Sequence, residues 1–124
     1  MNDDIIRYHS GEKLSRVLVH GGIVYLCGQV AEGYNDMPED IGAQTQAVLH
    51  RIDAHLAEAG TDKSRILTAT VYVRDIKQAG EANKVWNAWL AGCAPPARTC
   101  VQADLANPNI LIEITLQAAL PASA

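Results

Sequence analysis

Positive charge is scarce in this 124-residue chain, and several other features that mark particular protein classes are missing. Ten Lys and Arg residues against fourteen Asp and Glu give a formal net charge of -4. This negative balance argues against nucleic acid or an anionic membrane surface as a partner. No apolar run approaches the length needed to span a membrane. Internal repeats, linkers and low-complexity segments are also absent, so residues 1–124 are expected to form a single domain.

Cysteine is sparse as well. The chain has an odd number of cysteines and no CxxC pair among Cys27, Cys93 and Cys100. This usage argues against a disulfide framework or a zinc site, and it favours the reducing cytoplasm. The acidic stretch Met1–Asp4 agrees, because it lacks the basic and apolar regions of a signal peptide.

The four histidines form no metal-binding pattern. His50 and His55 are five residues apart, which is the wrong spacing for one helix face. No metal site is therefore expected, and surface or strand positions are the favoured interpretation of these histidines.

Short β-rich runs and two helical stretches make up the rest of the chain. The runs predict strands at 5–9, 15–20, 23–30, 65–73, 97–103 and 110–116. Gly21-Gly22 predicts a tight hairpin between the second and third of these strands. A capping box at Asp36 and Glu39 predicts a helix that runs to about Ala59, and a second helical region begins at Asp75. The order β-β-β-α-β-α-β-β predicts an α+β fold, a mixed sheet with two helices packed on one face.

The last two strands are predicted to form a hairpin, because Asn107-Pro108-Asn109 between them is a turn signal. Such a hairpin places Cys100 opposite Glu113 with Arg98 on the diagonal, on a polar sheet face. The other face of the last strand is aliphatic, with Ile110, Ile112, Ile114 and Leu116. From the residues alone, Arg98 and Glu113 read more readily as a structural cross-strand ion pair than as a site.

The uncovered sheet face also predicts an oligomer. Two helices on one face leave the other face with a mixture of apolar and polar side chains, and such a surface commonly marks an interface. The Arg98–Glu113 face is therefore expected at or near a boundary between copies of the chain. Trp86 and Trp89, at helical spacing, are read as core residues.

The segment Pro96–Val101, followed by Ile112-Glu113-Ile114, resembles the Rid family, the reactive intermediate deaminases or YjgF-like proteins. Cys27-Gly28-Gln29 and Asn83 support the resemblance, which covers nearly the whole chain. It implies a fold similar to chorismate mutase, assembled as a homotrimer with ligand sites in the clefts between subunits.

The resemblance also implies an activity, the hydrolysis of small 2-imino acids, related to 2-aminoacrylate, to 2-keto acids and ammonia. Arg98 matches the arginine that clamps the substrate carboxylate, and Glu113 matches the carboxylate that positions water. Cys100 backs the same site, where its neighbouring backbone helps to hold the ligand. Asn83 matches a polar helix residue that lines the pocket, and Cys27 and Gly28 are further substrate-binding residues by the same resemblance. No metal or organic cofactor is needed for this reaction.

Two departures from the family pattern concern the pocket wall. Many active members have Ser in place of Cys27, and a Tyr within a Gly-Pro-Tyr stretch in place of Lys13-Leu14. Two other functions remain open. One is a non-catalytic protein that binds a 2-keto acid through Arg98. The other is a protein-interaction or RNA-cleaving role attached to parts of this family, and the acidic balance argues against RNA.

Overall fold

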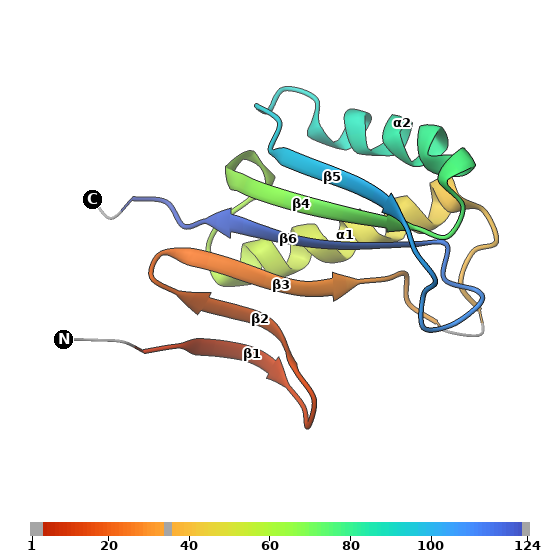
Figure 1. Cartoon of the computed structure of the whole chain (residues 1–124). Helices are drawn as coiled ribbons and strands as arrows, with labels where there is room; N and C mark the ends of the chain where they lie inside the picture. Colours follow the sequence, from red (N-terminus) through yellow and green to blue (C-terminus); the bar gives the residue numbers. More distant parts are fainter. Residues whose placement is uncertain (1–3, 34–35, 123–124) are drawn as a thin grey trace.

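A computed structural model describes residues 4–33 and 36–122 of the chain. It contains a six-stranded sheet and two α-helices (Figure 1). The strands are β1 Ile6–Ser10, β2 Ser15–His20, β3 Ile23–Gln29, β4 Ile66–Val73, β5 Ala97–Gln102 and β6 Ile112–Ala119. The helices are α1 Ile41–Ala59 and α2 Ala79–Leu90, with short 3-10 turns η1 Lys63–Arg65 and η2 Ile76–Gln78. The predicted α+β class and element order are confirmed.

The strands lie in the order β1-β2-β3-β6-β4-β5. All neighbouring strands are antiparallel except β4 and β5, which are parallel and are joined through α2. A crossover helix is the usual connection between parallel neighbours, because a tight turn can only reverse the chain. The predicted hairpin at Gly21-Gly22 is confirmed, and both glycines have the positive φ angles, 60° and 80°, that such a turn requires.

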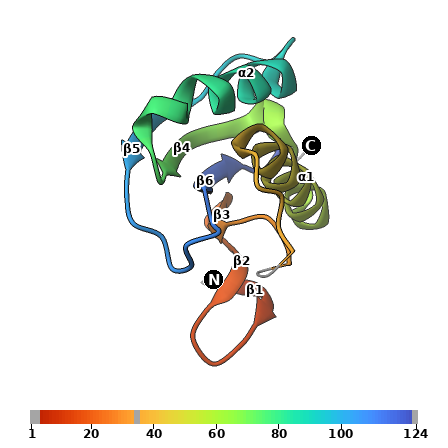
Figure 2. The same cartoon turned by 90° about the vertical axis from the view of Figure 1, so that its right-hand side faces the viewer.

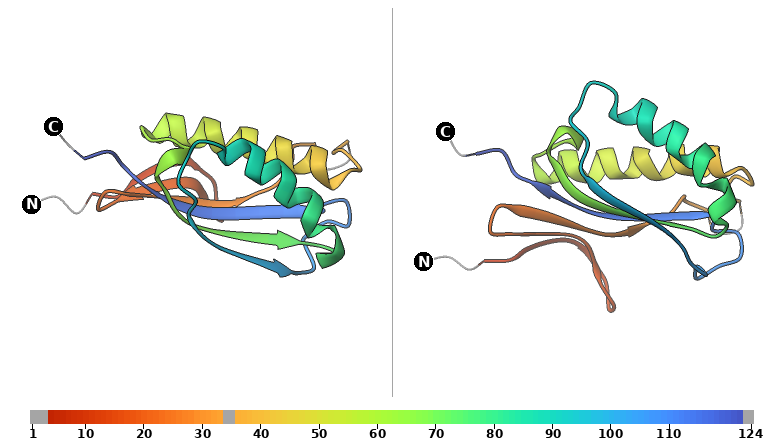
Figure 3. Two further views of the ribbon diagram at one scale, coloured as in Figure 1. Left: turned by 90° about the horizontal axis from the view of Figure 1, so that it is seen from above. Right: turned by 45° about the horizontal axis from the view of Figure 1, so that its top comes forward.

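Both helices cover the same face of the sheet (Figure 2). The core fills the space between them, and its fully buried side chains include Val48, Ile52, Leu56, Val71, Ile112 and Ile114. Truncating one of these isoleucines to alanine is expected to cost about 2–5 kcal/mol of unfolding free energy. No described element covers the opposite face, which is bare in Figure 3. Neither described helix is long and apolar enough to cross a membrane.

Two predicted boundaries are wrong. Helix α1 is capped by Asp40, whose side chain accepts from Ala43 N at 2.9 Å, whereas Asp36 lies in a preceding turn with Gly33. An N-cap directly precedes the first helical residue, and the buried stripe begins only at Ile41. At the other end of the chain, β6 extends to Ala119, three residues beyond the predicted strand end at Leu116. Residues Met1 to Asp3, which belong to the acidic stretch at the start of the chain, lie outside the described ranges.

The predicted C-terminal hairpin is also wrong. Strand β6 pairs with β3 and β4, and β5 lies on the far side of β4. Asn107-Pro108-Asn109 nevertheless forms a turn as predicted, since Ile110 N donates to Asn107 O at 3.0 Å. Arg74 holds this loop through Nε to Ile110 O at 2.9 Å and Nη2 to Asn107 O at 2.8 Å. The loop thus carries the chain past β4 and does not fold it back beside β5.

Candidate functional site

Arg98 lies on β5 with its side chain against α2. Its Nη2 donates to Asn83 Oδ1 at 2.7 Å, and its guanidinium carbon lies 5.0 Å from the centre of the Trp86 ring. Asn83 and Trp86 are three residues apart on α2 and therefore share a helix face. The hydrogen bond and the cation–π contact together fix the guanidinium plane.

The Nε atom of Arg98 is buried without a hydrogen-bond partner. Arg98 also forms no ion pair with any carboxylate in the part of the chain that the structure describes. A buried donor that lacks an acceptor is costly, particularly on a charged group. A carboxylate that meets the guanidinium along its Nε edge would supply this acceptor and could form two parallel hydrogen bonds. Arg98 therefore has hydrogen-bonding capacity that the described residues leave unused.

Cys100 lies two residues after Arg98 on the same face of β5. Its register partner on β4 is the buried Val71, and the half-buried Cys100 side chain packs against the main core. The thiol acts here as a small hydrophobic side chain that supports the strand beside Arg98. We call Arg98, Asn83, Trp86 and Cys100 the Arg98 group.

Glu113 lies on β6, next to an irregularity in β3. Leu26 pairs with Leu116, but Gln29 pairs with Ile114, so Cys27 and Gly28 together face the single residue Thr115. This is a β-bulge, a feature common beside functional sites.

The bulge brings Gly28 under the Glu113 carboxylate. A Cβ atom added at Gly28 would lie 1.8 Å from Glu113 Oε2, so only glycine leaves room for the observed position of that side chain. We call Cys27, Gly28 and Glu113 the Glu113 group.

Two hollows meet at Gly28. One has a volume of ≈ 400 Å³, and its lining includes Glu113, Tyr72, Asp104 and Thr115. The other, of ≈ 530 Å³, is lined by groups that include Leu14, Arg16, Cys27 and Arg51. The Glu113 group therefore lies beside open space of a size suitable for a small ligand and water.

The Cys27 thiol is poorly suited to nucleophilic chemistry. Burial is the largest cause that raises its pKa above the usual value, and Glu113 also raises it, while Arg16 and Arg51 oppose the shift. The thiol is therefore protonated near neutral pH, whereas the thiolate is the nucleophile. Gln29 Nε2 donates to Cys27 O at 3.0 Å and contacts the sulfur at 3.4 Å, which fixes the bulge.

The Arg98 group and the Glu113 group do not meet within one chain. Through β4, Arg98 aligns with Ala69 and Leu116 on the helix-covered face, whereas Glu113 aligns with Tyr72 and Val101 on the bare face. The prediction that Arg98, Cys100 and Glu113 share one face is therefore wrong. It failed because it assumed that β5 and β6 are direct partners.

Sequence reasoning also missed the part that Trp86 plays. The residue was assigned to the core, and it is buried, but its ring also carries the Arg98 guanidinium. The three-residue spacing of Asn83 and Trp86 already indicated that they share one face of a helix. That this face contacts Arg98 could be inferred only once β5 was known to lie alongside α2.

Comparison with known proteins gives consistent matches over almost the whole chain. Residues 7–120 match the family model described as Endoribonuclease L-PSP. A RutC family protein from Haemophilus ducreyi is 42% identical over 116 residues, covering 94% of this chain and 97% of the relative. The crystal structure of a YjgF family member from Neisseria meningitidis has a TM-score of 0.91 at 37% identity and covers 98% of both chains. A Rid family protein of unknown function from Yersinia pestis has a TM-score of 0.83 at 30% identity and covers 90% of both chains.

Proposed function

Because this chain belongs to the Rid (YjgF-like) family, we propose that it hydrolyses small reactive 2-imino acids, related to 2-aminoacrylate, to 2-keto acids and ammonia. The observation that carries the proposal is the guanidinium of Arg98, oriented by Asn83 and Trp86 and left with an unpaired buried Nε. A 2-imino acid has the planar carboxylate that this group can grip with two hydrogen bonds.

The complete site would be formed between two copies of the chain. Each copy holds the Arg98 group and the Glu113 group on opposite sheet faces, and β5 is an edge strand. The bare face and sheet margin expose Tyr25, Leu67 and Val101, which a neighbouring copy could cover. We propose a homotrimer in which Arg98 of one copy faces Glu113 of the next. Light scattering should then give three times the chain mass of 13.3 kDa.

In the proposed reaction, Arg98 holds the carboxylate and Glu113 orients a water molecule toward the imine carbon. Water adds to the C=N bond, its oxygen bonding to carbon while a proton moves to nitrogen. The resulting carbinolamine collapses to the keto acid and expels ammonia. Glu113 accepts and returns protons during these steps, a role that a carboxylate within one water of the reacting carbon can perform. Water is the only co-reactant.

The remaining predicted site residues have supporting roles in this proposal. Asn83 and Cys100 hold Arg98 in place, while Cys27 and Gly28 shape the wall beside Glu113. The three free thiols suit a reducing compartment, so the cytoplasm is the proposed location.

The decisive experiment combines two inactive variants. An amino-acid oxidase generates the imino acid in the cuvette, and keto-acid appearance is followed with and without the protein. Arg98→Ala and Glu113→Gln are assayed alone and after co-expression in equal amounts. If each site takes Arg98 and Glu113 from different chains, about half of the sites receive an intact Arg98 and about half receive an intact Glu113. Random assembly then gives both to about one quarter of the sites and restores about one quarter of wild-type activity. Absence of any rescue would show that the site does not lie between copies.

A non-catalytic function is the alternative that the separation of the two groups favours. If Glu113 never approaches the ligand, Arg98 would still bind 2-keto acids, and the protein would act as a binding or regulatory module. Saturable keto-acid binding without any acceleration of imine hydrolysis would support that role. Cleavage of RNA, the activity named in the family description, requires a surface attractive to phosphates, and the net charge of -4 argues against it.

A further inference from the structure

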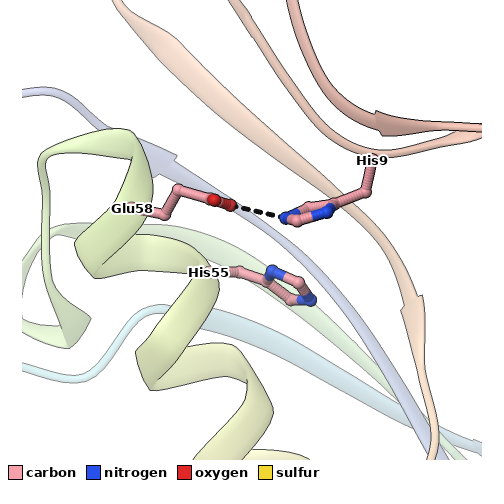
Figure 4. Close-up of side chains that lie close together, drawn as sticks. All are labelled: His9, His55 and Glu58. Carbon is pink, nitrogen blue, oxygen red and sulfur yellow. Dashed lines mark hydrogen bonds and ion pairs between the residues drawn. The ribbon is translucent and has the colours of Figure 1, made fainter.

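Three side chains with metal-binding atoms that belong to neither group described above lie close together. His9 on β1 and His55 and Glu58 on α1 point toward one another (Figure 4). Their nearest ligand atoms all lie within 4.8 Å of one another. His9 Nε2 lies 2.8 Å from Glu58 Oε1, and the two imidazole centres are 5.5 Å apart. Within residues 4–33 and 36–122, this is the one cluster of three such groups.

From this arrangement we propose that His9, His55 and Glu58 bind a divalent ion of the zinc class and so link β1 to α1. Two imidazole nitrogens and one carboxylate oxygen form a donor set that zinc uses in proteins, with a fourth position left for water. The side chains of His9 and Glu58 are 47% and 39% exposed, so an ion can reach them from solvent. This proposal is independent of imine hydrolysis.

The backbone of β1 is shaped to bring His9 to this place. Tyr8 pairs with the buried Val17 and packs against the core, so regular alternation would direct His9 toward the bare sheet face. His9 instead has a φ of 55°, the one positive value among described non-glycine residues, and it has no partner in the β1–β2 register. This local irregularity turns the imidazole toward Glu58 on α1.

The helix presents its two donors on one face. His55 and Glu58 are three residues apart on α1, a spacing that stacks side chains along a helix. Metal–ligand bonds of about 2.0–2.2 Å place tetrahedral donor atoms about 3.4 Å apart. The hydrogen-bonded His9–Glu58 pair would therefore open slightly and His55 would move inward, changes that partly exposed side chains can make by rotation.

Some charges around the cluster favour the binding of a cation and others oppose it. Glu58 attracts a cation, whereas Arg51 and Arg16 act on His55 with positive charge. Arg51 is itself engaged, since its Nη1 donates to Val30 O at 2.7 Å and its Nε lies 3.8 Å from Glu32. A metal ion binds the neutral form of an imidazole, whose unprotonated nitrogen offers a lone pair.

The test is calorimetric titration of metal-stripped protein with zinc chloride at pH 7.5, supported by thermal unfolding. One ion should bind per chain, and the unfolding temperature should rise with zinc concentration, because an ion bound only by the folded state stabilises it. His9→Asn keeps a residue that tolerates positive φ, and Glu58→Gln keeps the side-chain shape. Each of these, and His55→Gln, should weaken zinc binding by at least about 10-fold.

The matched control is His50→Gln, an exposed histidine on the same helix outside the cluster. It should bind zinc as the parent does. Cobalt titration separates the site from the three cysteines, because thiolate ligands add a charge-transfer absorption that imidazole and carboxylate do not. Absence of zinc uptake, equal uptake by His55→Gln and His50→Gln, or a thiolate signature would each overturn the proposal and leave the cluster as a hydrogen-bonded contact only.

Discussion

The Arg98 group and the Glu113 group differ in how their charged side chains are held in place. Arg98 is oriented by the Asn83 amide and the Trp86 ring, both on a helix packed against the core. The Glu113 side chain forms no hydrogen bond or ion pair with any of the residues that the structure describes. Its backbone is held in β6, and its carboxylate occupies the space that Gly28 leaves beside it.

This difference matches the two tasks proposed for them. A binding group gains affinity when it is fixed in the geometry of the complex, because less side-chain freedom is lost when the ligand arrives. A group that exchanges protons with water needs access to solvent and an oxygen free to accept. The first group should therefore affect mainly substrate affinity, and the second mainly turnover.

The largest expected effect is that of Glu113→Gln. The amide keeps the size of the side chain but cannot accept a proton from water. We expect kcat for imine hydrolysis to fall by about 10²–10⁴-fold while 2-keto acids still bind. Steady-state kinetics and calorimetric titration with a keto acid measure the two quantities. A variant that assembles normally and turns over within a few-fold of the parent would show that Glu113 is structural.

Arg98→Lys should have the next largest effect, and this effect should be on KM, whereas Glu113→Gln acts on kcat. Lysine keeps the charge but offers no planar fork and cannot reproduce the stacking on Trp86. We expect kcat/KM to fall by about 10²-fold, mainly through a higher KM. Arg65→Lys is the matched control, since the Arg65 guanidinium donates to the backbone carbonyls of Ala119 and Leu120. Near-normal turnover by Arg98→Lys at low substrate would refute the carboxylate clamp.

Gly28→Ala tests whether shape alone positions Glu113. The added methyl would collide with the far end of the Glu113 side chain, which can rotate away, so folding should be little affected. We expect about a 10-fold loss of kcat with a change in unfolding free energy within about 1 kcal/mol. Gly80→Ala is the control, since a Cβ there meets nothing within 4 Å. Equal activity of the two variants would mean that the position of the carboxylate is unimportant.

The smallest expected effect concerns Cys27 and pH. Its raised pKa means that, at any pH below that value, less thiolate is present than for an ordinary cysteine. Alkylation by iodoacetamide, followed at this residue by peptide mass spectrometry, should be slower than that of a free thiol at pH 8 and should increase at higher pH. Arg16 lowers this pKa, so Arg16→Gln should slow the reaction further. Faster alkylation than a free thiol would indicate an activated cysteine.

Patterns along single segments were reliable guides to this fold. The alternation in β6 correctly assigned Ile112, Ile114 and Leu116 to the buried face and Glu113 to the other. Gly21-Gly22 correctly predicted a hairpin. The expected place of Arg98 and Cys100 on one face of β5 also agrees with their shared register on β4. These features depend on the conformation of adjacent residues in a turn and on the alternation of side chains along a strand. Both can be read directly from the sequence.

Partners that are distant in sequence were decided only by the tertiary structure. Side-chain alternation tells which residues of a strand share a face, but it does not tell which strand lies next to it. The crossover through α2 placed β5 beside β4, and this alone separated Arg98 from Glu113. In the same way, His9 met His55 and Glu58 only because β1 and α1 pack near each other. The local sequence pattern thus determined the helices, the strands and the faces of their side chains. Which functional groups meet was determined by the packing of elements that are distant in sequence, because that packing depends on burying the apolar faces of all elements at once.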